Sequence, residues 1–265
     1  MKLSDHSEHI RQLIDNAFRN RLGRMGFVNY ELGITDPELV TGDHKRMETI
    51  LYVLRKETGN KKDAFEKLID ELTFTLFNRI AALKVMEAHT LHPEIITRRS
   101  QHGDRSLAHF AWLEQNPQAR QEDAEGLVPF LEDQLQKLSS EIPLFNPQHP
   151  YHLLPTALEL NNIMLAFNQI ETDDQVETDI WRSDDVLGWL YESYNNQKKL
   201  AHKESGEKTE YNKVSIQSQV YTPRWVVKFL VDNSLGKLYL EMYPESDIKN
   251  KYKIANAPSK QTHDV

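Results

Sequence analysis

The residues most suggestive of chemistry are a threonine, a proline and an arginine at the start of an apolar helical pattern. Thr222 is a good N-cap, Pro223 fits the first helical position, and the apolar residues that follow have helical spacing. Proline has no amide hydrogen, so the unpaired donors of the first turn would include the amides of Arg224 and Trp225. These donors, the helix dipole and the Arg224 cation favour an anion such as a carboxylate or phosphate. The pattern indicates either an anion-binding helix start or an ordinary capped helix.

The most cationic polar stretch of the chain lies near residue 100 and contains Arg98, Arg99 and Arg105. If the amino-terminal half of the chain contacts DNA, we expect the contact here, and mainly to phosphates, because phosphate contacts need only positive charge and hydrogen-bond donors. The alternative is a solvated loop whose arginines pair with the two acidic stretches of the chain, residues 122–141 and 171–185.

No set of residues predicts a metal or catalytic centre. His89 and His92 are three positions apart, but Pro93 interrupts the helix there and no nearby carboxylate completes a recognisable ligand set. The chain contains no Walker, serine-hydrolase or zinc-protease motif, and no nuclease motif beside a convincing apolar strand. We therefore expect no catalytic residue and no metal ligand in this chain.

Composition limits the classes of protein that remain. The 265 residues carry a formal net charge of -8, which argues against the whole chain gripping nucleic acid, and they include no cysteine, which excludes disulfides and thiolate metal sites. The first residues are charged where a signal peptide would be apolar, and no later run approaches membrane-spanning length. We expect a soluble cytoplasmic protein that does not contact a membrane.

Elements that would position these residues are helices, because apolar residues recur at helical spacing through most of the chain. The expected helices cover residues 5–22, 43–57, 63–88, 120–139, 156–170 and 183–202. The third is apolar on nearly all sides and should be buried, so Arg79 within it must find a carboxylate, a carbonyl or the solvent edge. Four prolines predict an irregular connection over residues 142–155. The fold class should be mainly α.

These elements suggest a division of the chain into four parts. Residues 1–140 and 141–200 would form two helical subdomains, and residues 201–214 a polar linker with few apolar side chains. Residues 215–265 would then begin a further domain at the Thr222 corner.

Three stretches, in this order, resemble one protein family. Residues 71–87 read ELTFTLFNRIAALKVME, residues 184–194 read DDVLGWLYESY, and residues 219–224 read QVYTPR. The last resembles the segment before the cofactor-binding core of adenine-specific DNA methyltransferases. All three together are similar to the amino-terminal region of PglX-type methyltransferases, the modification enzymes of BREX phage-defence systems. The resemblance covers nearly the whole chain.

The resemblance implies that Tyr221, Thr222, Pro223 and, less directly, Arg224 line a pocket for S-adenosylmethionine. The family continues into an Asp-Pro-x-x-Gly-x-Gly loop and an Asn-Pro-Pro-Tyr motif, and neither occurs here. We therefore expect an amino-terminal fragment that leads into a missing Rossmann-like methyltransferase domain.

The intact enzyme would methylate an adenine flipped out of double-stranded DNA and could bind other defence proteins. The fragment alone should be inactive, with weak or no cofactor binding. The alternative function is a non-catalytic, acidic helical adaptor that binds protein partners.

Overall fold

A computed structural model describes residues 2–34, 36–205 and 222–248 of the chain. The chain forms two compact units, Met1–Lys208 and Thr209–Val265. Both are helical, which confirms the predicted mainly α class. In the described ranges, no helix has the length and apolar content needed to cross a bilayer.

The first unit is a bundle of long helices with a smaller helical layer at one end. Its only described strands, β1 (Phe27–Val28) and β2 (Glu31–Leu32), form a short antiparallel hairpin. The α-helices are α1 (Leu3–Arg24), α2 (Gly42–Thr58), α3 (Lys61–Ala88), α4 (Leu107–Gln115), α5 (Leu127–Leu138), α6 (Ala157–Ile170) and α7 (Val186–Ser205). Short 3-10 turns occur at Pro37–Leu39, Ser100–His102, Pro117–Gln121, Asp123–Glu125, Pro143–Phe145 and Ile180–Arg182.

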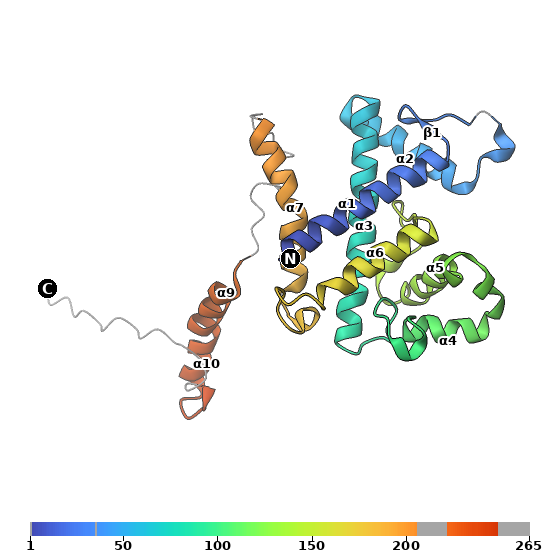
Figure 1. Ribbon diagram of the computed structural model, residues 1–265. Helices are drawn as coiled ribbons and strands as arrows, with labels where there is room; N and C mark the ends of the chain where they lie inside the picture. The colour runs from blue at the N-terminus through green and yellow to red at the C-terminus, as the bar shows by residue number, and fades with distance from the viewer. Residues whose placement is uncertain (1, 35, 206–221, 249–265) are drawn as a thin grey trace. The chain divides into compact units, whose positions relative to one another are not determined.

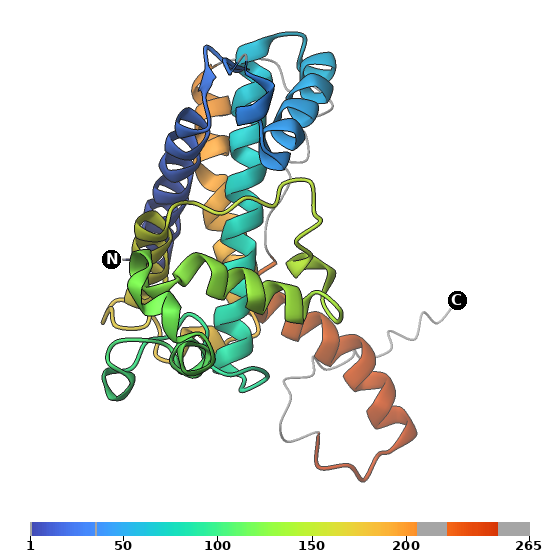
Figure 2. The same ribbon diagram turned by 90° about the vertical axis from the view of Figure 1, so that its right-hand side faces the viewer.

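Helix α3 is the central element of this unit. Its start is fixed by Asn60, whose side chain accepts a hydrogen bond from the Asp63 amide at 2.8 Å. Its apolar side chains are buried on nearly all sides, as predicted, with α1, α2 and α6 packed around it (Figures 1 and 2). Phe77 joins α3 to α6 and α7, because its ring lies 5.4 Å from that of Phe167 and 5.2 Å from that of Tyr194.

One hydrophobic core extends through the Met1–Lys208 unit. It includes Ile14 of α1, Leu72 of α3 and Leu131 of α5, but also Ile163 of α6 and Leu190 of α7. The ranges 1–140 and 141–200, which the sequence suggests as separate subdomains, therefore bury their side chains together. The proline-rich connection between them contains a single 3-10 turn and no α-helix.

The predicted helix over residues 120–139 begins later than expected. Ala124 and Gly126 have left-handed backbone conformations, with φ of 47° and 67°, and such residues interrupt an α-helix. Helix α5 therefore starts at Leu127. Helix α4 was not predicted, although Ser106 caps it by accepting a hydrogen bond from the His109 amide.

Helix α7 also differs from its predicted range. Ser183 was expected to be its N-cap, but the helix starts at Val186, after the 3-10 turn at Ile180–Arg182. At its other end α7 continues to Ser205, so the first residues of the predicted 201–214 linker are helical. The rest of that linker lies outside the described residues.

The second unit contains α9 (Arg224–Val231), a π-helical turn (Asp232–Gly236) and α10 (Lys237–Met242). Between residues 222 and 248 no apolar side chain is buried. The large exposed side chains include Trp225, Phe229, Leu230, Leu235, Leu238 and Met242.

Candidate functional site

The predicted anion-binding corner lies at the start of α9. Thr222, Pro223 and Arg224 are all exposed, and Tyr221 lies outside the described residues. Pro223, not Thr222, is the N-cap: its backbone is extended, and its carbonyl accepts hydrogen bonds from the amides of Val226 and Val227, at 2.9 and 3.2 Å. The helix therefore begins one residue later than predicted, with Arg224 at its first position.

The predicted basic loop is a small hairpin whose ends, Arg99 and Arg105, form an isolated antiparallel bridge. Arg98 is half-buried and donates a hydrogen bond to the side-chain oxygen of Asn161 on α6. Arg99 is exposed and donates through Nε and Nη2 to Glu94 Oε1, at 2.9 and 2.5 Å. Both side chains are therefore held by partners in the same unit.

Arg105, the third arginine of this group, makes a two-pronged contact with Glu125. Its Nε and Nη2 each lie 2.6 Å from a carboxylate oxygen of Glu125, and this pairing raises the pKa of Arg105 and lowers that of Glu125. The carbonyl of Glu125 lies 2.9 Å from His109 Nε2, and the His109 ring stacks on Phe130. Burial lowers the pKa of His109. The basic loop is thus tied to the start of α5.

Arg79 has the structural partners that the sequence required, which confirms that prediction. Its guanidinium donates to the carbonyls of Leu144 and Asn146, both at 2.8 Å, and to His152 Nδ1 at 2.5 Å. His152 Nε2 in turn lies 2.9 Å from a carboxylate oxygen of Glu132. Burial lowers the pKa of Arg79 to about 10, so the group keeps its charge at neutral pH. This cluster joins the proline-rich connection to α3.

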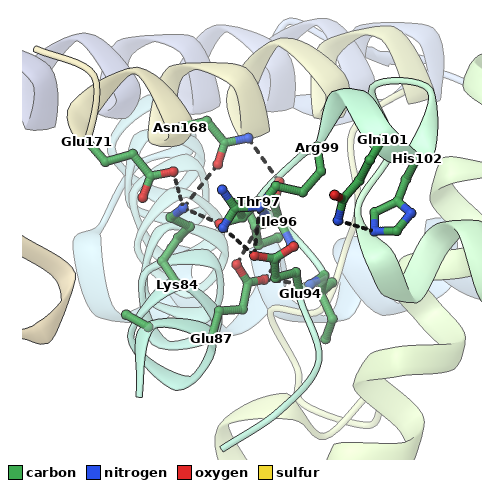
Figure 3. Close-up of polar contacts among 12 residues, drawn as sticks. Lys84, Glu87, Glu94, Ile96, Thr97, Arg99, Gln101, His102, Asn168 and Glu171 are labelled. Carbon is green, nitrogen blue, oxygen red and sulfur yellow. Dashed lines mark hydrogen bonds and ion pairs between the residues drawn. The ribbon is translucent and has the colours of Figure 1, made fainter. Parts of the chain in front are cut away.

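A second buried cation, Lys84, lies near the end of α3 and was not singled out by the sequence. Its ammonium group donates to Thr97 Oγ1 at 2.5 Å, Asn168 Oδ1 at 3.1 Å and Glu171 Oε1 at 3.0 Å, as Figure 3 shows. The side chain is 1% exposed. Its three acceptors match the three protons of an ammonium group, so the charge is buried without an unmet donor.

Glu87, one turn further along α3, accepts three backbone amides. The amides of Ile95 and Ile96 donate to Oε1 and the amide of Thr97 donates to Oε2 at 3.1 Å (Figure 3). No local pattern in the sequence predicts these contacts, because the partners of Lys84 and Glu87 come from the loop after α3 and from α6 and its C-cap.

These two side chains form one wall of a cavity of about 520 Å³. Its lining also includes Thr97, Arg99, Glu171 and Arg182. Among the residues that the structure describes, no three histidine or carboxylate side chains are grouped closely enough to hold a metal ion. The cavity lining combines charged side chains with hydrogen-bonding groups.

Comparison with known proteins finds no matching protein-family profile. No solved structure matches the chain. Two curated relatives do. One is "Adenine-specific methyltransferase BrxX" of Escherichia coli O9:H4 (strain HS), 30% identical over 77% of this chain and 18% of that protein. The other is "Adenine-specific methyltransferase PglX" of Lacticaseibacillus casei (strain Zhang), 26% identical over 74% of this chain and 18% of that protein. The chain thus spans less than a fifth of the length of these relatives.

Proposed function

This chain is homologous to PglX-type adenine-specific methyltransferases, and we propose that it is the amino-terminal region of such an enzyme. The intact protein would transfer a methyl group from S-adenosylmethionine to an adenine at a specific site in double-stranded DNA, in the cytoplasm, as part of a BREX-type phage-defence system. The similarity to the Escherichia coli relative over 77% of this chain carries the proposal.

Within that enzyme, the Met1–Lys208 unit would be a scaffold and the second unit would contribute one wall of the cofactor pocket. Thr222, Pro223 and Arg224 support this role because they are exposed at the start of a helix, where backbone amides and a cation favour a carboxylate. The methionine part of the cofactor carries such a group. Tyr221 would complete the wall.

The apolar side chains of α9 and α10 support a docking role for the second unit. A helix in water keeps its large apolar residues on a covered face, yet those between Trp225 and Met242 are exposed. A Rossmann-like methyltransferase domain, to which the resemblance assigns the cofactor loop, would cover them.

Contact with DNA would use the basic loop at Arg98, Arg99 and Arg105. Arg99 is the most accessible of the three, because Arg98 and Arg105 are half-buried and hold the loop against α6 and the 3-10 turn before α5. A phosphate would have to compete with Glu94 for Arg99. We therefore place any DNA contact of this unit at Arg99 and assign the other two arginines to positioning the loop.

The test uses the full-length gene product that contains this chain. It should transfer labelled methyl groups to the amino group of adenine in duplex DNA, whereas the 265-residue chain alone should transfer none. The double variant Thr222→Ala and Pro223→Ala should lower the affinity for S-adenosylmethionine, measured by calorimetry, about tenfold, the effect of losing roughly 1.4 kcal/mol. Thr49→Ala, an exposed threonine on α2, is the control.

The alternative function is a non-catalytic helical adaptor for other defence proteins. The net charge of -8 and the exposed apolar side chains of α9 and α10 favour protein partners over DNA for this chain. Unchanged cofactor affinity in the Thr222 and Pro223 double variant would support the adaptor and contradict the pocket.

A further inference from the structure

The cavity of about 520 Å³ in the first unit lies where α3 and α6 both end. Lys84 and Glu87 come from the last turns of α3, and Glu171 follows the end of α6. The loop after α3 and the segment that contains Asp179, Trp181 and Arg182 provide most of the remaining lining. Its size falls within the range of small-molecule sites, roughly 300 to 1,000 Å³. The proposed cofactor wall lies in the other unit, and of the three arginines in the proposed DNA contact only Arg99 lines this cavity.

Most charges in the cavity wall already have partners. Lys84 is paired with Glu171 at 3.0 Å, and Arg99 with Glu94 at 2.5 Å. Glu87 is held by three backbone amides, as Figure 3 shows. These groups therefore fix the walls, and the two ion pairs leave little net charge for a ligand to meet.

Unlike the paired charges of the wall, two opposite charges of the lining are not paired with each other. Asp179 and Arg182 both line the cavity and are exposed, and they do not form an ion pair with each other. Arg182 is oriented by a hydrogen bond from its Nε to the carbonyl of Ala88 at 3.0 Å, at the end of α3. In the described part of the chain, neither its terminal nitrogens nor the Asp179 carboxylate has a partner.

These two charges belong to the two ends of one short turn. Asp179 has a left-handed conformation, with φ of 58°, directly before the 3-10 turn at Ile180–Arg182. Trp181 lies between them in sequence and is 2% exposed. Its ring lies 6.1 Å from that of Phe167, centroid to centroid, and its indole N–H has no acceptor among the described residues. The turn thus carries an anion and a cation that flank a buried aromatic residue in the sequence.

We propose that this cavity binds a small zwitterion of the amino-acid type, with its ammonium group at Asp179 and its carboxylate at Arg182. A guanidinium binds a carboxylate through two parallel hydrogen bonds, and Nε of Arg182 is already used, which leaves its two terminal nitrogens for the ligand. A simple anion would leave Asp179 unmatched and a simple cation would leave Arg182 unmatched. A molecule with both charges satisfies both residues.

Trp181 provides a direct readout of binding. In a nitrogen-correlated NMR spectrum of the 265-residue chain, its indole N–H gives one signal, which is assigned by its loss in Trp181→Phe. The standard L-amino acids are added one at a time. At least one should shift this signal and saturate below about 10 mM. Analogues of that amino acid that lack the amino group or the carboxylate should bind at least about 5-fold more weakly.

Asp179→Asn is the decisive variant, because asparagine tolerates the left-handed backbone as aspartate does. It should weaken binding of the amino acid about 5-fold with no change in the melting temperature. Asp174→Asn, an exposed carboxylate outside the cavity lining, should leave binding unchanged. The proposal is overturned if no amino acid shifts the Trp181 signal, if Asp179→Asn binds as the unmodified chain does, or if both variants weaken binding equally.

Discussion

Arg79 Nη1 and His152 Nδ1 lie 2.5 Å apart in the core of the first unit, and this contact fixes the tautomer of the histidine. A guanidinium can only donate hydrogen bonds, so Nδ1 must accept. The ring proton is therefore on Nε2, which donates it to Glu132 at 2.9 Å. A buried arginine on α3 is thus connected through a neutral imidazole to a carboxylate on α5, and the intervening proline-rich segment is held between them.

Arg79→Met should be strongly destabilising. It leaves the carbonyls of Leu144 and Asn146 without donors and removes the cation that faces Glu132. Breaking a buried charged cluster in this way costs roughly 3 to 5 kcal/mol of unfolding free energy. Urea denaturation measures the loss. Arg24→Met, which breaks an exposed pair with Glu159, should cost about 1 kcal/mol or less, and equal losses would contradict the assigned role of Arg79.

Glu87→Gln should loosen the loop that follows α3. Glutamine keeps only one acceptor oxygen and presents its amino group to the other donors, so the amides of Ile95, Ile96 and Thr97 cannot all keep an acceptor. We expect a loss of about 1.5 to 3 kcal/mol of unfolding free energy, with faster hydrogen exchange among these loop amides.

The matched control for Glu87 is Glu94→Gln, which removes only the partner of the exposed Arg99. That variant should cost about 1 kcal/mol or less. Unchanged hydrogen exchange of the loop amides in Glu87→Gln would show that the carboxylate does not hold the loop.

Stability should fall as the pH is lowered, partly because of His109. Burial lowers the pKa of His109 in the folded chain, so between that pKa and about 6.5 the unfolded chain binds a proton that the folded chain does not. The contribution is therefore complete above pH about 6.5 and is lost as the pH falls through the folded pKa. Arg105 and Arg98 oppose protonation, whereas the Glu125 contacts favour it.

His109→Gln tests this effect, because its amide can still donate to the carbonyl of Glu125 but does not titrate. The unfolding free energy should then depend less on pH below about 6.5 than in the unmodified chain. Urea denaturation at several pH values gives both curves. Parallel curves would exclude His109 as a source of the pH dependence.

Two glycines allow backbone strain to be separated from packing. Gly59 and Gly126 both have left-handed backbones, with φ of 80° and 67°. An added Cβ at Gly59 meets nothing within 4 Å, but at Gly126 it lies 2.8 Å from the Cβ of Ala119 and 3.3 Å from the Trp112 ring. Gly59→Ala should cost about 1 to 2 kcal/mol, and Gly126→Ala about 1 to 3 kcal/mol more. Equal costs by thermal or urea denaturation would show that the ring and Ala119 move aside.

Local patterns in the sequence determine most of the long helices and the fold class. The apolar spacing of residues 63–88 predicts the central helix, because burial on all sides needs an apolar surface on all sides. Thr156 and Glu159 form a capping box at the start of α6, a signal that spans only four residues of sequence. Resemblance in three short stretches likewise pointed to the family of the two relatives.

Tertiary structure alone decides which polar groups meet. Arg79 contacts Leu144 and Asn146 across 65 and 67 positions, and Lys84 reaches Glu171 across 87. No local pattern carries such pairings, because they depend on how whole helices pack. The left-handed residues before α5 also escaped the helical pattern of residues 120–139, since apolar spacing reports which side chains are buried and not the backbone angle at one position. The cavity between the ends of α3 and α6 is likewise set by the tertiary structure, because the packing of helices that are distant in the sequence creates it.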